Sequence, residues 1–212
     1  MPVIKYLHQH PDFSSGLQKL LKQDKIFRGL NVKPEEMLWP KRSLNFQSFI
    51  SAIVSQQISV KAAASIYQKL VDRLHGELTP DSFLSLSDED LRSCGLSYGK
   101  IKYGRGVAQA ILTKEFSPAR LHRMSDDDVI ADITKLSGFG VWSAQMVLIF
   151  SLARPDVWPV GDLGIQLGAG RYLRLKEKPD LATVRELGER WKGNRSAASL
   201  LLWHIANNKL EI

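Results

Sequence analysis

Asp162 lies twenty-two residues after the second glycine of the segment Leu136-Ser137-Gly138-Phe139-Gly140-Val141. The two glycines permit positive φ and leave no side chain over the backbone, so the amides that open a following helix can point outward and hold an anion. A carboxylate near such a site can stabilise positive charge that develops in a bound substrate. The spacing therefore indicates an anionic ligand held close to a reactive carboxylate.

Each of these two features also has a purely structural interpretation. A bare Gly-x-Gly is more often a helix-glycine-helix corner, in which Gly138 is an ordinary C-cap. Asp162 precedes a helical segment, and aspartate is among the commonest N-cap residues. The capping and chemical roles of Asp162 are compatible, because an N-cap carboxylate is held rigidly at the mouth of its helix.

Composition favours an anionic partner. The 212 residues carry 29 Lys and Arg against 22 Asp and Glu, a net charge of +7, which is typical of nucleic-acid-binding proteins although many basic proteins bind none. A hydrophobic fraction of 44% fills the core of one large domain or two small lobes. The single cysteine, Cys94, excludes an intramolecular disulfide and a four-cysteine metal or iron–sulfur site, and we expect it to be buried.

The chain has no signal-peptide core and no apolar run near the ~20 residues of a membrane span. We expect an intracellular, soluble protein without a membrane partner, cytoplasmic or nucleoid-associated in a bacterium and nuclear in a eukaryote. Ser or Thr repeatedly precedes an amphipathic run that Gly or Pro ends, which predicts an all-α fold. The predicted helices are 59–74, a short helix after Thr79, helices that begin after Ser87 and Ser97, and then 125–136, 141–153, 181–191 and 195–207. Glycines 164, 168 and 170 weaken the helical pattern after Asp162.

Three separated segments carry a resemblance to a known family. Leu136–Ala144 with Trp158-Pro159-Val160-Gly161-Asp162, Phe49–Ala63 and Cys94–Lys100 resemble, in order, motifs of the helix-hairpin-helix DNA glycosylase superfamily. The chain is most similar to its 3-methyladenine DNA glycosylase II branch, over about residues 44–208. The resemblance implies a two-lobed helical bundle with the active-site cleft between the lobes. One lobe, about 44–155, would carry the hairpin at 136–144, and the other would join 1–43 to 156–212 within a single glycosylase unit, 1–212.

The resemblance also implies an activity. A monofunctional enzyme of this branch flips an alkylated purine, such as 3-methyladenine or 7-methylguanine, out of DNA and hydrolyses its N-glycosidic bond, which leaves an abasic site in base-excision repair. Asp162 would stabilise the oxocarbenium-like sugar and orient the attacking water. Some relatives place a nucleophilic lysine two residues after the second hairpin glycine. This chain has Trp142 there, so we expect no strand cleavage.

An electron-rich indole favours a cationic methylated purine by stacking and cation–π attraction. Trp142, Met146, Trp203 and Trp39 are the candidates for the base pocket, with ordinary core packing as the alternative for each. Gln57 resembles the residue that fills the gap left by the flipped base, although close relatives have an apolar wedge there. The candidate DNA-binding residues are Gln56, Gln57, Ser59, Lys61, Gly138, Phe139, Gly140, Val141 and Lys100. Alternatively, the glutamines cap helix ends and the lysines are solvated surface charges.

No paired ligand spacing occurs among the five histidines, so we expect no catalytic metal and no cofactor, apart from a possible monovalent cation on hairpin carbonyls. The expected partner is double-stranded DNA that contains a damaged base, bound by a monomer. Two other functions stay open on sequence alone. One is a non-catalytic DNA-damage-binding protein, and the other is a glycosylase for deaminated or oxidised bases.

Overall fold

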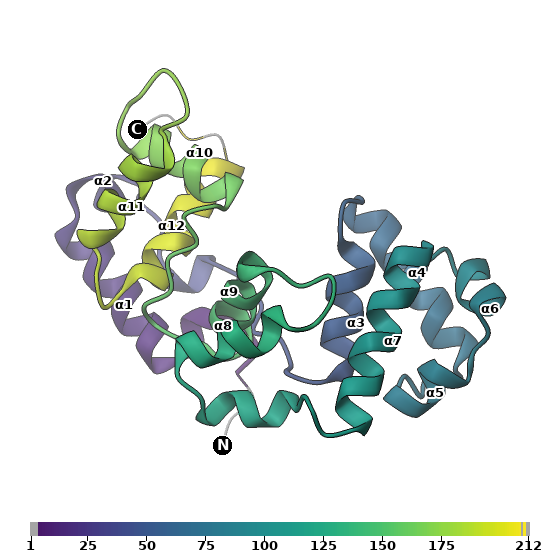
Figure 1. Ribbon diagram of the computed structural model, residues 1–212. Coiled ribbons are helices and arrows are strands. Elements are labelled where there is room, and N and C mark those ends of the chain that lie inside the picture. Colours follow the sequence, from purple (N-terminus) through teal and green to yellow (C-terminus); the bar gives the residue numbers. More distant parts are fainter. Residues whose placement is uncertain (1–3, 209, 211–212) are drawn as a thin grey trace. The chain divides into compact units, whose positions relative to one another are not determined.

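The computed structural model describes residues 4–208 and 210, and coiled ribbons account for its regular structure (Figure 1). Within these residues there is no β-strand, and the only bridge joins Tyr6 to Pro40 as an isolated antiparallel pair. The all-α prediction is confirmed. Across the same residues, no helix is both long and apolar enough to cross a membrane.

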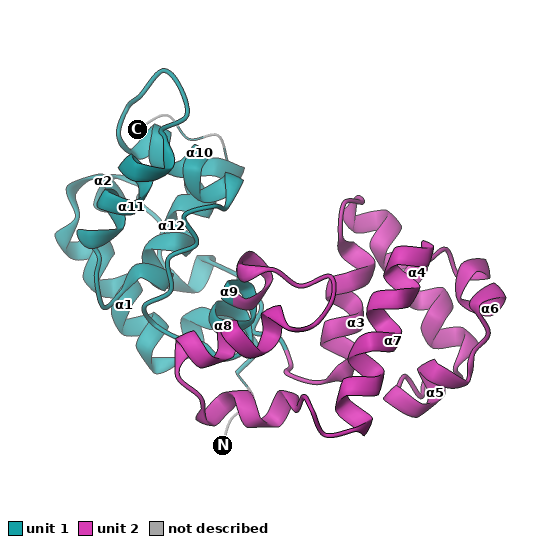
Figure 2. Cartoon of the chain, in the orientation of Figure 1, with its two compact units in different colours: residues 1–42, 145–212 teal, residues 43–144 magenta. Residues whose placement is uncertain are grey.

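The chain divides into two compact units (Figure 2). Unit 1 comprises residues 1–42 and 145–212, and unit 2 comprises residues 43–144. The α-helices of unit 1 are α1 (Pro11–Gln23), α2 (Lys25–Gly29), α10 (Leu163–Tyr172), α11 (Leu181–Glu189) and α12 (Arg195–Asn207), with 3-10 helices at Leu7–Gln9 and Pro34–Glu36. Those of unit 2 are α3 (Phe46–Ser55), α4 (Val60–Arg73), α5 (Pro80–Ser85), α6 (Asp88–Ser93), α7 (Tyr98–Leu112) and α8 (Asp126–Thr134), with a 3-10 helix at Pro118–Arg123.

The boundary between the units lies inside α9 (Val141–Phe150), earlier than the position near residue 155 that the sequence suggested. Polar contacts tie the end of α9 to the N-terminal segment of unit 1. The Arg42 amide donates to the Phe150 carbonyl at 2.8 Å, and Lys41 Nζ donates to the Ser151 carbonyl at 2.7 Å. Burial of Lys41 lowers the pKa of its ammonium group. The second half of α9 therefore belongs to unit 1.

The predicted helix starts are confirmed because they rest on local caps. The side chains of four cap residues accept amide hydrogen bonds from three residues further on, namely Ser59 from Ala62, Ser87 from Asp90, Ser97 from Lys100 and Ser125 from Asp128. Helix ends are less well predicted. We expected the helix at 141 to continue to 153, but α9 ends at Phe150 and Ala153 has a positive φ of 54°.

Aromatic side chains fill the core of each unit. In unit 2, the Phe49 ring lies 5.2 Å from Phe116 and 5.5 Å from Phe139. Cys94 is buried, as predicted. In unit 1, the rings of Phe27, Tyr172 and Trp191 lie 5.1 Å apart, pair by pair. The Asp24 carboxylate accepts hydrogen bonds from Tyr172 and Trp191 there, and burial together with that bond raises the pKa of the Tyr172 hydroxyl.

Candidate active site

Asp162 is the N-cap of α10. Its Oδ1 accepts a hydrogen bond from the Ile165 amide at 2.9 Å, which satisfies one of the amides that open the helix. The same oxygen accepts a second bond, from Nε1 of Trp203 on α12, at 2.7 Å. Asp162 is half-buried. The predicted catalytic carboxylate is thus held by one local donor and by one donor 41 residues away in the chain.

Trp203 belongs to an aromatic cluster of unit 1 formed by Trp39, Phe150 and Trp203. The Phe150 and Trp203 rings are stacked, with centroids 5.6 Å apart, and Trp39 lies 6.3 Å from Phe150 and 5.7 Å from Trp203. The Arg42 guanidinium lies 4.8 Å from the centre of the Phe150 ring, and burial lowers the pKa of this group. Trp203 is only 7% exposed, whereas Trp39 is half-buried.

Glycines in α10 allow this cluster to lie close to Asp162. A Cβ atom on Gly164 would lie 2.6 Å from Cδ1 of Trp203 and 3.1 Å from Oδ1 of Asp162. A Cβ atom on Gly168 would clash with the backbone carbonyl of Leu202 on α12. Two of the three glycines that weakened the predicted helix, Gly164 and Gly168, are therefore positions at which α10 packs directly against α12, whereas Gly170 faces residues 177–179.

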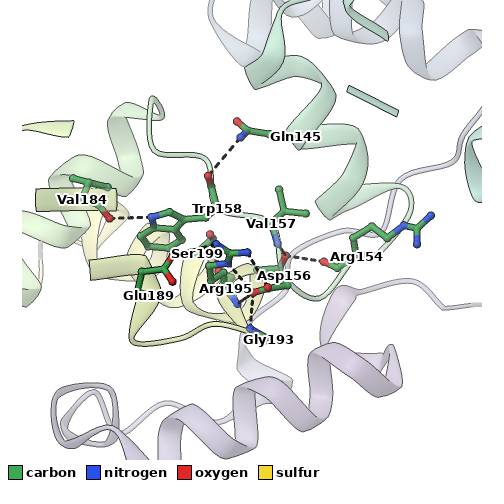
Figure 3. Close-up of polar contacts among 11 residues, drawn as sticks. Gln145, Arg154, Asp156, Val157, Trp158, Val184, Glu189, Gly193, Arg195 and Ser199 are labelled. Atoms are coloured by element: carbon green, nitrogen blue, oxygen red, sulfur yellow. Dashed lines mark hydrogen bonds and ion pairs between the residues drawn. The ribbon is translucent and has the colours of Figure 1, made fainter. Parts of the chain in front are cut away.

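The loop that leads to Asp162 is anchored at its start by Asp156. Figure 3 shows the Arg195 side chain and the Gly193 amide pointing toward this carboxylate. Arg195 Nε and one Asp156 oxygen are 2.8 Å apart, its NH2 group and the other oxygen are 2.8 Å apart, and the Gly193 amide donates at 2.7 Å. The next residue, Val157, donates its amide to Ser196 Oγ at 2.9 Å. These bonds join the loop to the start of α12, which carries Trp203.

We expect Asp156→Asn to destabilise unit 1 by about 2 kcal/mol at pH 7, because it weakens charge-assisted hydrogen bonds. Burial alone would raise the pKa of Asp156, but bonds from the Arg195 side chain and from the Arg195 and Gly193 amides lower it below its ordinary value of 3.8. A lowered carboxyl pKa stabilises the fold above the unfolded-state value, and this contribution is lost as pH falls through the folded-state value. Urea unfolding should therefore show a difference between wild type and variant at pH 7 that shrinks below about pH 4. A difference that stays constant with pH would contradict this account.

In the hairpin between α8 and α9, one of the two glycines adopts the positive φ that the sequence permits. Gly138 has a φ of +87°, and a Cβ atom there would clash with the ring of Tyr103. The first bond of α9 runs from the Ala144 amide to the Gly140 carbonyl at 3.1 Å. The amide of Val141, the first residue of α9, therefore precedes the helical ladder, which makes it a candidate to hold a phosphate.

Phe139 contributes to the hairpin in another way than expected. Its side chain is 6% exposed and packs on Phe49, and its amide donates to the Leu136 carbonyl at 3.0 Å. Any role of Phe139 in DNA binding is therefore limited to shaping the hairpin. The Val141 amide, at the start of α9, stays the candidate for phosphate contact.

The loop between α3 and α4 contacts the hairpin within unit 2. Gln56 Nε2 donates to the Gly138 carbonyl at 2.9 Å. Lys100 Nζ donates to the Val54 carbonyl at 2.7 Å, and burial lowers the pKa of Lys100. Gln56 and Lys100 thus both donate to backbone carbonyls within unit 2. The Gln56 side chain reaches the hairpin and not a helix end, so this bond differs from the capping alternative that the sequence left open.

Gln57 lies at an exposed loop position with a φ of +57°, and Ser59 and Lys61 are exposed near it. Two apolar neighbours escaped the sequence analysis: Ile58 is 38% exposed and Val60 is 88% exposed. The signal in the sequence that could have identified these two residues is their apolar character in an otherwise polar segment. They supply the apolar surface that Gln57 itself lacks.

The structure brings three of the predicted residues of unit 1 together, namely Asp162, Trp203 and Trp39. Trp142, 51% exposed, lies in unit 2, and Met146 is half-buried one helical turn later in α9. The sequence analysis missed Phe150, Arg42, Asp156 and Ser196. Nothing local distinguishes these residues, because their partners are distant in the chain.

Comparison with known proteins identifies the family. The profile of the HhH-GPD superfamily base excision DNA repair protein family matches residues 50–193. DNA-3-methyladenine glycosylase 1 of Schizosaccharomyces pombe is 35% identical over 181 residues, which are 82% of this chain and 76% of that protein. A putative DNA-3-methyladenine glycosylase of Bacillus subtilis is 28% identical over 165 residues, and the match covers 74% of this chain and 58% of the relative.

A solved structure agrees with this assignment. The 3-methyladenine DNA glycosylase of Schizosaccharomyces pombe in complex with abasic DNA aligns with a TM-score of 0.76 and 28% identity, over 91% of this chain and 97% of that one. The chain thus shares its fold with a glycosylase whose structure was solved in complex with abasic DNA. From the sequence profile and the shared fold together, the chain belongs to the HhH-GPD superfamily of base excision DNA repair proteins.

Proposed function

We propose that this protein is a monofunctional DNA glycosylase that removes alkylated purines, such as 3-methyladenine and 7-methylguanine, during base-excision repair. The observation that carries the proposal is the Asp162 carboxylate, fixed at the start of α10 and bonded to a member of an aromatic cluster. Relatives named DNA-3-methyladenine glycosylases support the substrate class. A fold shared with a glycosylase bound to abasic DNA supports the product.

The chemistry follows from the carboxylate. Cleavage of the N-glycosidic bond leaves positive charge on the deoxyribose, and an ionised aspartate held nearby stabilises that charge as it develops. The base departs with the bonding electron pair, water adds to the sugar carbon and loses a proton to the solvent, and an abasic site remains. Asp162 orients this water. Because two donors hold its Oδ1, the carboxylate needs little reorganisation during the reaction.

Strand cleavage is not part of the proposed reaction. A lyase uses an amine to form a Schiff base with the opened sugar. The position two residues after Gly140 is Trp142, and the nearest lysine in sequence, Lys135, precedes the hairpin. We propose Met146 and Trp39, which both belong to unit 1, as walls of the base pocket. For Trp142, in unit 2, a role in the pocket stays a prediction from the sequence.

Charge is unequally divided between the units. Unit 1 holds 18 Lys and Arg against 11 Asp and Glu, whereas unit 2, which carries the hairpin, holds 11 of each. We propose that unit 1 supplies most of the general attraction to the DNA backbone. In the neutral unit 2, phosphate binding depends on hairpin amides. We propose that a monovalent cation there would be held by hairpin carbonyls, of which that of Gly138 also accepts a bond from Gln56.

We expect Val141→Pro to weaken binding of duplex DNA that contains an abasic-site analogue by about 10-fold, because it removes one amide hydrogen bond to a phosphate. Val141 is the first residue of α9, and proline is tolerated there. The measurement is fluorescence anisotropy at fixed salt. Leu181→Pro, at the first position of α11, is the matched control and should bind as wild type does. Equal binding by both variants would exclude this amide as a phosphate ligand.

The activity itself is tested by single-turnover release of free base from methylated duplex DNA. We expect wild type to release methylpurines, and the strand to break only after alkali treatment. Breaks before alkali would contradict the monofunctional mechanism. Tight, salt-sensitive DNA binding without release of a methylated base would instead favour a binding protein or another damaged base as substrate.

A further inference from the structure

The ring of Trp203 has little room for a stacked base. One face lies on Phe150 at a centroid distance of 5.6 Å, with an angle of 22° between the two ring planes. Trp39 packs against it at 5.7 Å and 47°, and only 7% of Trp203 is exposed. A flipped base needs an open aromatic face. Trp203 is thus poorly placed as the pocket wall that the sequence suggested.

The edge of the same ring is directed at Asp162. Nε1 lies 2.7 Å from Asp162 Oδ1, which also accepts the Ile165 amide at 2.9 Å. Two donors from different helices, α10 and α12, therefore bind the same carboxylate oxygen and define its orientation. The missing side chain at Gly164 leaves the space for this approach, since a Cβ atom would lie 3.0 Å from Nε1.

We propose that Trp203 is a positioning residue, which acts on glycosidic bond cleavage through Asp162 and not by stacking on the target base. This inference rests on the proposed function, in which Asp162 is the catalytic carboxylate. Phe150 and Trp39 hold the indole in place, the indole N–H holds Oδ1, and the carboxylate keeps one orientation as charge develops on the sugar. Recognition of the base is left to other side chains, among them the half-buried Trp39.

The proposal predicts that loss of the indole N–H slows bond cleavage but leaves binding of the substrate DNA unchanged. Trp203→Phe keeps an aromatic ring on Phe150 and removes the N–H donor. We expect the maximal single-turnover rate of base release from methylated duplex DNA to fall at least 10-fold, while the enzyme concentration that gives half this rate stays within 2-fold of wild type. A stacking role predicts the reverse, a higher half-saturating concentration with a smaller effect on the maximal rate.

Trp191→Phe is the matched control. Trp191 is also buried in unit 1, and its Nε1 also donates to an aspartate, Asp24, at 3.2 Å. We expect its maximal rate to match that of wild type. An equal loss in both variants, a normal rate in Trp203→Phe, or a raised half-saturating concentration in that variant would each overturn the proposal.

Replacement of Trp203 by 3-benzothienylalanine, in which sulfur takes the place of the N–H group, removes the donor with almost no change in shape. This variant should show the same loss as Trp203→Phe, and a wild-type rate in it would overturn the proposal even if Trp203→Phe fails to fold. Failure of the proposed function is distinguishable, because wild type itself would then release no methylated base.

Discussion

We expect Asp162→Asn to lower the single-turnover rate of methylpurine release by about 100-fold or more. Loss of one electrostatic stabiliser of a transition state typically has an effect of this size. The substitution removes the negative charge that offsets the developing charge on the sugar. Asparagine is as good an N-cap as aspartate, and its carbonyl oxygen can accept the same bonds from Ile165 and Trp203. The loss therefore reports the charge and not the cap.

Asp180→Asn is the control for this prediction. Asp180 is the N-cap of α11 and accepts the Thr183 amide at 2.7 Å, so the two variants make the same chemical change at equivalent positions of two helices. We expect Asp180→Asn to release methylpurine at the wild-type rate. Thermal unfolding and binding to abasic-site DNA should be similar for all three proteins. Release by Asp162→Asn within a few-fold of wild type would eliminate Asp162 as the catalytic carboxylate.

Gly168→Ala is expected to destabilise unit 1 by about 3 kcal/mol, the upper part of the range for an overpacked core. The added Cβ atom would meet the backbone carbonyl of Leu202, which cannot move aside as a side chain can. Helices α10 and α12 must then separate, and the bond between Trp203 and Asp162 weakens with them. Urea or thermal unfolding measures the loss of stability, and base release should fall even at temperatures where the variant is folded.

We expect Gly106→Ala to have the opposite effect on stability. Gly106 also lies inside a helix, α7, but a Cβ atom there meets nothing within 4 Å. Alanine should therefore stabilise unit 2 by about 0.5–1 kcal/mol, the ordinary difference in helix propensity. If both variants unfold alike, close packing of α10 on α12 is not the reason for glycine at position 168.

Local sequence determined the helices and the two motifs that suggested function. The starts of α4, α6, α7 and α8 were predictable because a serine binds an amide three residues away, so all the necessary atoms lie within one turn. The hairpin was predictable for the same reason, since Gly138 adopts the positive φ that its sequence permits. Asp162 was found through its spacing from that hairpin, and its N-cap bond to Ile165 is equally local.

Tertiary structure decided how the residues around Asp162 act, because their partners are far away in the chain. Gly164 and Gly168 look like helix breakers until α12 is packed against them. The indole of Trp203 could have faced a base or a carboxylate, and only its burial between Phe150 and Trp39 turns its N–H toward Asp162. Such choices depend on shape complementarity between helices, which periodicity and capping do not encode.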